Sequence, residues 1–64
     1  MKIRFLGTTS DNGGCPTVYA TDRGTYVVQG TIVSDSEALG GLRDLASDET
    51  AVEIPKELIK YFTE

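Results

Sequence analysis

The chain has 64 residues, with ten acidic and six basic side chains, no histidine, no tryptophan and one cysteine. A chain this short forms one domain with a small core, so we expect a single domain over residues 1–64 of marginal stability. One cysteine excludes an internal disulfide, and the lack of histidine disfavours a zinc site, so we predict no metal and no cofactor.

The net charge of −4 is distributed unevenly. Residues 1–30 carry three bases and two acids, or +1, whereas residues 31–64 carry three bases and eight acids, or −5. The acidic second half disfavours binding to a phosphate backbone and fits either solubility or a partner with a basic surface. The sequence predicts no signal peptide and no membrane-spanning helix, and a lone thiol is typical of a reducing compartment, so we expect a cytoplasmic protein.

The first predicted element is a short strand over residues 2–6. Ile3 and Phe5 lie at alternate positions and would point to one side of it, as in a half-buried strand. Lys2 and Arg4 would point to the other side. Bases on one side of a short strand are typical of a protected sheet edge.

A loop rich in Ser, Asp, Asn and Gly follows over residues 7–14. Its consecutive glycine amides could form an anion-binding nest, which makes residues 10–15 a candidate ligand-binding loop. The loop has neither the lysine nor the following helix of a phosphate-binding loop. Cys15 would begin the next strand, where a cysteine is usually a small buried residue.

The central feature of the sequence is a predicted hairpin with strands over residues 16–21 and 25–29. Both segments are rich in Val, Thr and Tyr, and residues 22–24 between them are typical of a three-residue turn with Gly24 left-handed. A two-residue turn at Arg23 and Gly24 would segregate polar from apolar side chains less well, because a shift of one residue sends every side chain to the other face.

The three-residue turn fixes the pairing of side chains across the hairpin. Val18 would face Val28, and Ala20 would face Tyr26, on one side of the sheet. The other side is more polar and more exposed to solvent. It would hold the apolar pair Tyr19 and Val27, which is either ordinary cross-strand packing or an interface patch. The candidate protein-interface residues are Tyr19, Val27, Thr17 and Gln29 on this side, and Tyr61 near the C-terminus.

Gly30 predicts a bend, after which residues 31–33 form a strand that could reach a different neighbour. The spacing from Ser34 to Glu37 is that of a capping box and predicts a helix over residues 35–46. Two glycines inside this helix each cost about 1 kcal/mol relative to alanine. The helix should therefore dock on the sheet through its apolar side, formed by Leu39, Leu42 and Leu45.

A strand over residues 50–54 and a short helix over residues 55–62 follow, with Pro55 well placed at the first helical position. We therefore predict an α+β fold in which a small antiparallel sheet packs against a capped helix and a short C-terminal helix. The sheet would have three to five short strands, at about residues 2–6, 16–21, 25–29, 31–33 and 50–54.

Residues 52–58 look like the strand, Ile-Pro-Lys-Glu and helix segment of AbrB/MazE-type swapped-hairpin proteins, which bind DNA as dimers. The glycine turn and basic residues that precede this segment in those proteins are missing, and acidic residues stand there instead. We interpret the likeness as the common chemistry of a strand, a proline and a helix.

A broader pattern covers most of the chain from Ser10 onward. A Ser- and Gly-rich loop enters a strand through Gly-Gly-Cys, and a tight turn, a Val-rich strand, a closing strand and an amphipathic terminal helix follow. This order resembles small actinobacterial proteins of the BldB/WhiJ-neighbour type. The matching segments are residues 10–15, 18–20, 26–28, 52–54 and 55–62. The chain departs from the family where Gln29-Gly30-Thr31 replaces Arg-Asp-Ser-Lys, and where a capped helix is inserted near residues 34–46.

The resemblance implies a non-enzymatic protein of unknown function, encoded beside helix-turn-helix regulators, that acts by protein–protein contact. No catalytic residues are carried over, and no Ser or Cys has a base partner, so we do not expect an enzyme. We expect a small acidic regulatory protein, antitoxin-like, that binds a helix-turn-helix regulator, a toxin-like protein or itself, without direct nucleic-acid or membrane binding. One alternative is a DNA-contacting dimeric regulator using Lys2, Arg4 and Arg23. A second is a small ligand-binding protein using residues 10–15.

Overall fold

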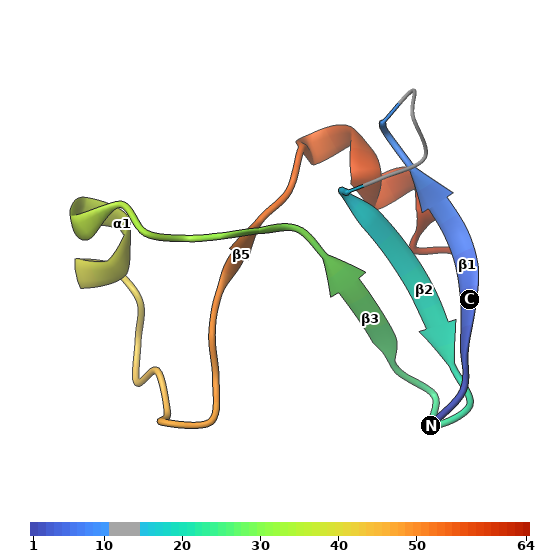
Figure 1. Ribbon diagram of the computed structural model, residues 1–64, viewed down its shortest axis with the longest axis horizontal. Helices are drawn as coiled ribbons and strands as arrows, with labels where there is room; N and C mark the ends of the chain where they lie inside the picture. The colour runs from blue at the N-terminus through green and yellow to red at the C-terminus, as the bar shows by residue number, and fades with distance from the viewer. Residues whose placement is uncertain (11–14) are drawn as a thin grey trace.

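The computed structural model describes residues 1–10 and 15–64. Its elements form a three-stranded sheet, a separate two-stranded sheet and two short helical segments (Figure 1). In chain order they are β1 (Ile3–Thr8), β2 (Thr17–Thr21), β3 (Tyr26–Gln29), β4 (Thr31–Ile32), α1 (Ser36–Gly40), β5 (Val52–Glu53) and the 3₁₀ helix η1 (Lys56–Tyr61). The fold is broadly α+β and mostly antiparallel, as predicted, although its strands form two sheets.

The larger sheet has the order β1-β2-β3, with β2 in the centre and antiparallel to both neighbours. Val18 pairs with Val28 and Ala20 with Tyr26, so the predicted hairpin register is confirmed. Gly24 has a φ of 75°, the left-handed conformation that a three-residue turn places at its last residue.

β1 is longer than predicted because Gly7 belongs to the strand rather than to the loop. The register shifts between Phe5, which pairs with Tyr19, and Gly7, which pairs with Val18. Leu6 is the extra residue of this bulge, and β1 continues beyond it to Thr8. Residues 7 and 8, which were predicted as loop, are therefore part of a paired strand with a bulge.

The core lies between η1 and one face of this sheet. Leu58 of η1 and Val18 of β2 are fully buried. The Tyr26 ring meets the Phe62 ring edge-to-face, with centroids 5.0 Å apart. A helix was predicted over residues 55–62; the structure has a tighter 3₁₀ segment, in which the Leu58 N–H donates to the Pro55 carbonyl at 3.1 Å. This pattern of bonds to the third residue back is typical of short helical pieces.

Residues 31–53, which we call the arm, leave the sheet after β3 and return at η1. Within the arm β4 pairs antiparallel with β5, through Thr31–Glu53 and Ile32–Val52. The ladder continues where the Val33 N–H donates to the Ala51 carbonyl at 3.0 Å. The prediction that the chain bends at Gly30 and finds a new neighbour is therefore confirmed. Figure 1 shows α1 at the end of the arm far from β1, β2 and β3.

The predicted helix over residues 35–46 is wrong in length, in cap and in packing. Only residues 36–40 are helical, and the cap is Asp35, whose carboxylate accepts the Ala38 N–H at 2.9 Å, one residue beyond the predicted Ser34. The helix ends at its glycine pair, where helical conformation is costly. Every residue from 34 to 50 is exposed, so the arm leucines do not dock on the sheet.

Candidate protein-interaction surface

Within residues 1–10 and 15–64, no helix lies over the sheet face opposite η1, and we call this face the open face. Directly paired residues lie on the same face of a sheet, and neighbours along a strand alternate. Ala20 and Gly7 lie on the η1 side, so the pairs Phe5–Tyr19 and Tyr19–Val27 lie on the open face, with Ile3 at its end.

The apolar side chains of the open face are substantially exposed. Ile3 is 50% exposed and Phe5 is 56% exposed, while Tyr19 and Val27 are half-buried. The Phe5 and Tyr19 rings meet edge-to-face, with centroids 6.4 Å apart. The four side chains thus form an apolar stripe across all three strands of the sheet.

The predicted interface residues are only partly brought together. Tyr19, Val27 and Gln29 share the open face, and the Tyr19 hydroxyl donates to Gln29 Oε1 at 2.9 Å. Thr17 lies on the same face but is only 2% exposed, so it cannot contact a partner directly. Tyr61 lies on the opposite side, with its ring against Gly7.

Sequence reasoning missed Ile3 and Phe5 as surface residues. Their alternation with Lys2 and Arg4 indicated which side chains share a side, and this was correct. It did not indicate which side η1 covers, because that depends on where the C-terminal segment packs. The sequence predicted two helices, over residues 35–46 and 55–62, and either could have covered this side, so no signal in the pattern marked Ile3 and Phe5 as exposed.

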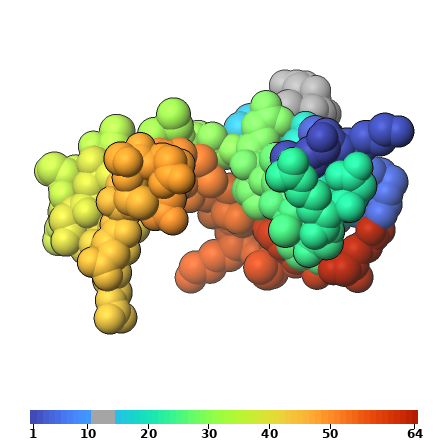
Figure 2. Space-filling model, turned by 90° about the horizontal axis from the view of Figure 1, so that it is seen from below, coloured from blue at the N-terminus to red at the C-terminus, as the bar shows by residue number. Residues whose placement is uncertain are grey.

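The arm is the second exposed apolar surface. Five of its large apolar side chains are between 36% and 65% exposed. A groove of about 780 Å³ runs along β4, β5 and the start of α1, lined by Ile32, Ala38 and Val52 among others. Figure 2 shows the arm standing apart from the sheet and η1. The exposed residues are Ile32, Leu39, Leu42, Leu45 and Val52.

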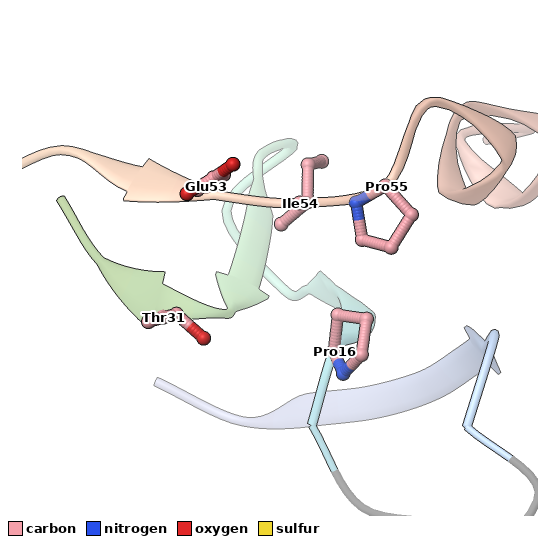
Figure 3. Close-up of a pocket in the computed structure, with 5 residues that line it drawn as sticks. All are labelled: Pro16, Thr31, Glu53, Ile54 and Pro55. Carbon is pink, nitrogen blue, oxygen red and sulfur yellow. The ribbon is translucent and has the colours of Figure 1, made fainter. Parts of the chain in front are cut away.

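The root of the arm holds a smaller pocket of about 350 Å³ (Figure 3). The Pro16 and Pro55 rings approach it from different segments, and Ile54 lies on the segment that runs from β5 to Pro55. Thr31 and Glu53 supply its polar groups. One carboxylate and one hydroxyl beside proline rings form no arrangement of nucleophile, base and oxyanion donor.

The candidate ligand-binding loop over residues 10–15 falls mostly on residues 11–14, which lie outside the described residues. At its edges, the Ser10 N–H donates to Thr8 Oγ1 at 3.1 Å. Cys15 is exposed, unlike most cysteines at the start of a strand. The strand begins at Thr17 instead, after the Cys15–Pro16 peptide bond, which is cis.

The three bases of the nucleic-acid alternative do not form one patch. Arg4 lies on the η1 side and pairs with Glu64, whose hydrogen bond and charge raise the pKa of the guanidinium above its ordinary value. Lys2 and Arg23 lie at the turn end of the sheet, where the Lys2 backbone N–H donates to the Asp22 carboxylate at 3.2 Å. Two bases at one end of the sheet and a third that is paired with an acid give a weak footprint for a phosphate backbone.

Within residues 1–10 and 15–64, no group of three or more His, Cys, Asp and Glu side chains could hold a metal ion. The helices in the same residues are too short to cross a membrane. Comparison with known proteins finds no matching family model, no similar curated protein and no similar solved structure. The two family resemblances therefore stay predictions.

Proposed function

We propose that this chain is a non-enzymatic interaction protein whose open face and arm bind another polypeptide. The observation that carries this proposal is the amount of surface that the chain exposes. Its accessible surface is 5051 Å², whereas a compact monomer of 6.9 kDa exposes about 4,000 Å². The excess of about 1,000 Å² is close to the roughly 800 Å² that each partner buries in a standard interface.

The shape of the molecule supports the same proposal. The Cα radius of gyration is 12.9 Å, whereas a compact chain of 64 residues has one of about 10.7 Å. The arm accounts for this extension, since it projects from the sheet (Figures 1 and 2). Paired strands of two residues and a helix of five residues are too short to be stable alone. A bound polypeptide would supply the burial that the arm lacks.

A polypeptide fits these surfaces better than a small molecule does. Small-molecule sites are concave and enclose most of their ligand. Here the exposed apolar side chains lie on a sheet face and on a projecting arm. A regulatory, antitoxin-like role beside a helix-turn-helix protein in the cytoplasm is the finer form of the proposal. Its support is the resemblance, the single cysteine and the acidic second half of the chain.

Affinity capture from the cell of origin tests the proposal, with the chain tagged and an untagged copy also expressed. Wild type should retain a polypeptide, either another protein or the untagged copy. Phe5→Ser removes the most exposed apolar side chain of the open face, and a triple change of Leu39, Leu42 and Leu45 to Ser removes three of the five exposed large apolar side chains of the arm. At least one of these variants should lose the bound polypeptide.

Ile59→Ser is the matched control, because Ile59 is 67% exposed but lies on η1, outside the open face and the arm. It should retain whatever wild type retains, which separates loss of a specific surface from loss of any apolar side chain. Far-UV circular dichroism establishes that each variant is folded. Recovery of the same polypeptides with all four proteins, or of none with wild type, would overturn the proposal.

A further inference from the structure

We infer that the polypeptide which covers the open face is the arm of a second copy of this chain, and that two copies exchange arms reciprocally. This inference rests on the proposed function and names its partner. Both surfaces that lack a cover belong to one chain, so a symmetric pair satisfies both at once. In a two-fold dimer each copy gives its arm and receives its partner's.

Charge selects this pairing over the other contacts that two copies could make. The arm carries six acids and one base, or −5, whereas residues 1–30 carry three bases and two acids, or +1. Two arms in contact would repel each other, while an arm against the sheet brings opposite charges together. Among the described residues the ion pair is between Arg4 and Glu64, so Lys2 and Arg23, at the turn end of the sheet, have no such partner.

The root of the arm holds it away from its own sheet. A Cβ atom on Gly30 would lie 2.9 Å from Cγ2 of Ile54 and 3.0 Å from the Glu53 carbonyl oxygen, so the two chain segments pack closely there. The β4–β5 ladder begins directly beyond this contact. Folding the arm back onto its own open face would break the close contact at Gly30 and the β4–β5 ladder. The open face of a second molecule lies within reach of a projecting arm without either loss.

The two surfaces are of similar kind. The arm offers Leu39, Leu42 and Leu45, each between 38% and 47% exposed, and the open face offers Ile3 and Phe5. Reciprocal exchange covers one arm and one face on each copy. The excess surface of about 1,000 Å² per chain is sufficient for a standard interface.

Sedimentation equilibrium of the purified full chain tests the inference over a range of concentrations. Wild type should form a dimer of twice the 6.9 kDa chain mass. Phe5→Ser and the triple Leu→Ser variant should each raise the dimer dissociation constant at least about tenfold, as truncation of central apolar side chains does. Ile59→Ser should leave it unchanged.

A mixing experiment then identifies which surfaces meet. The Phe5→Ser copy keeps an intact arm, and the triple variant keeps an intact open face, so an equimolar mixture restores one of the two contacts. The mixture should form more dimer than either variant alone at the same total concentration. If arm met arm, Phe5→Ser would not weaken the dimer, and if face met face, the triple variant would not.

Either of those results, or a mixture no more dimeric than its components, overturns arm exchange. A chain that stays monomeric at millimolar concentration overturns the second copy as partner. The proposed function would then still stand if capture recovers a different protein that Phe5→Ser or the triple variant loses. The two failures are therefore distinguishable.

Discussion

Of the glycines that the structure describes, Gly7 is the one at which an added side chain would meet the closest contacts. It is buried on the side of β1 that faces η1. A Cβ atom there would lie 2.6 Å from Cδ2 of Tyr61 and closer still to Cγ and Cδ1. The tyrosine ring thus occupies the space that any other side chain would need, and this contact fixes how η1 lies on the sheet.

We predict that Gly7→Ala lowers the free energy of unfolding by about 1–3 kcal/mol, the usual cost of overpacking a filled core. Urea denaturation followed by circular dichroism measures it. Gly40→Ala is the control, because nothing lies within 4 Å of the Cβ it would add. That change should be neutral or slightly stabilising, since alanine favours the helix. Equal stability of the two variants would show that Tyr61 does not pack on Gly7.

At the scale of elements, α1 begins at a cap that the sequence pattern placed one residue too early. Ser34 and Asp35 both suit a cap position, so the pattern alone does not separate them. In the structure the Asp35 side chain accepts the Ala38 N–H. The helix has only five residues, so this bond is a large part of what holds it.

We predict that Asp35→Ala unwinds α1, while Ser34→Ala leaves it intact. Loss of a cap destabilises a helix by about 0.5–2 kcal/mol, which is enough to unfold a helix of only five residues. The Cα chemical shifts of residues 36–40 report the helix directly. Because α1 lies in the exposed arm, the urea midpoint of the sheet should move little in either variant. If the helical shifts are lost in Ser34→Ala but kept in Asp35→Ala, the cap is Ser34, as the sequence pattern indicated, and not Asp35.

The elements that the sequence predicted well are those fixed by local chemistry. The turn at Gly24 sets the β2–β3 register within a few residues, so the pattern sufficed there. The arm was predicted poorly because the docking of Leu39, Leu42 and Leu45 depends on the direction in which the chain leaves Gly30. That direction is set by packing against Ile54, a residue 24 positions further along.

The candidate site follows the same division. Alternation placed Tyr19 and Val27 together on one side of the hairpin, and the structure agrees. It could not show that η1 packs on the other side, which exposes Phe5 and removes Tyr61 from the set. The covered face of a thin sheet depends on the whole chain, because it is the face on which the short C-terminal segment η1 packs.

At the scale of the whole molecule, the arm and the segment that contains the large sheet differ in net charge, and both expose apolar surface. The arm holds a charge of −5 and the segment containing the large sheet holds +1. Each part also exposes apolar side chains that the other could cover in a second copy. Charge at the rim of such an interface acts mainly on association rate and on salt dependence, whereas the apolar centre supplies affinity.

We predict that Lys2→Glu weakens dimerisation about two- to fivefold at low salt, because it turns the charge of residues 1–30 from +1 to −1 against an arm of −5. Lys60→Glu changes the net charge equally but lies on η1, away from the turn end of the sheet, and should have a smaller effect. Sedimentation equilibrium compares the two at about 0.02 M and 0.5 M salt. The difference should vanish at the higher concentration, where the screening length falls to about 4 Å. Equal weakening by both variants would mean that only total charge matters, and that the arm does not meet the lysine end of the sheet.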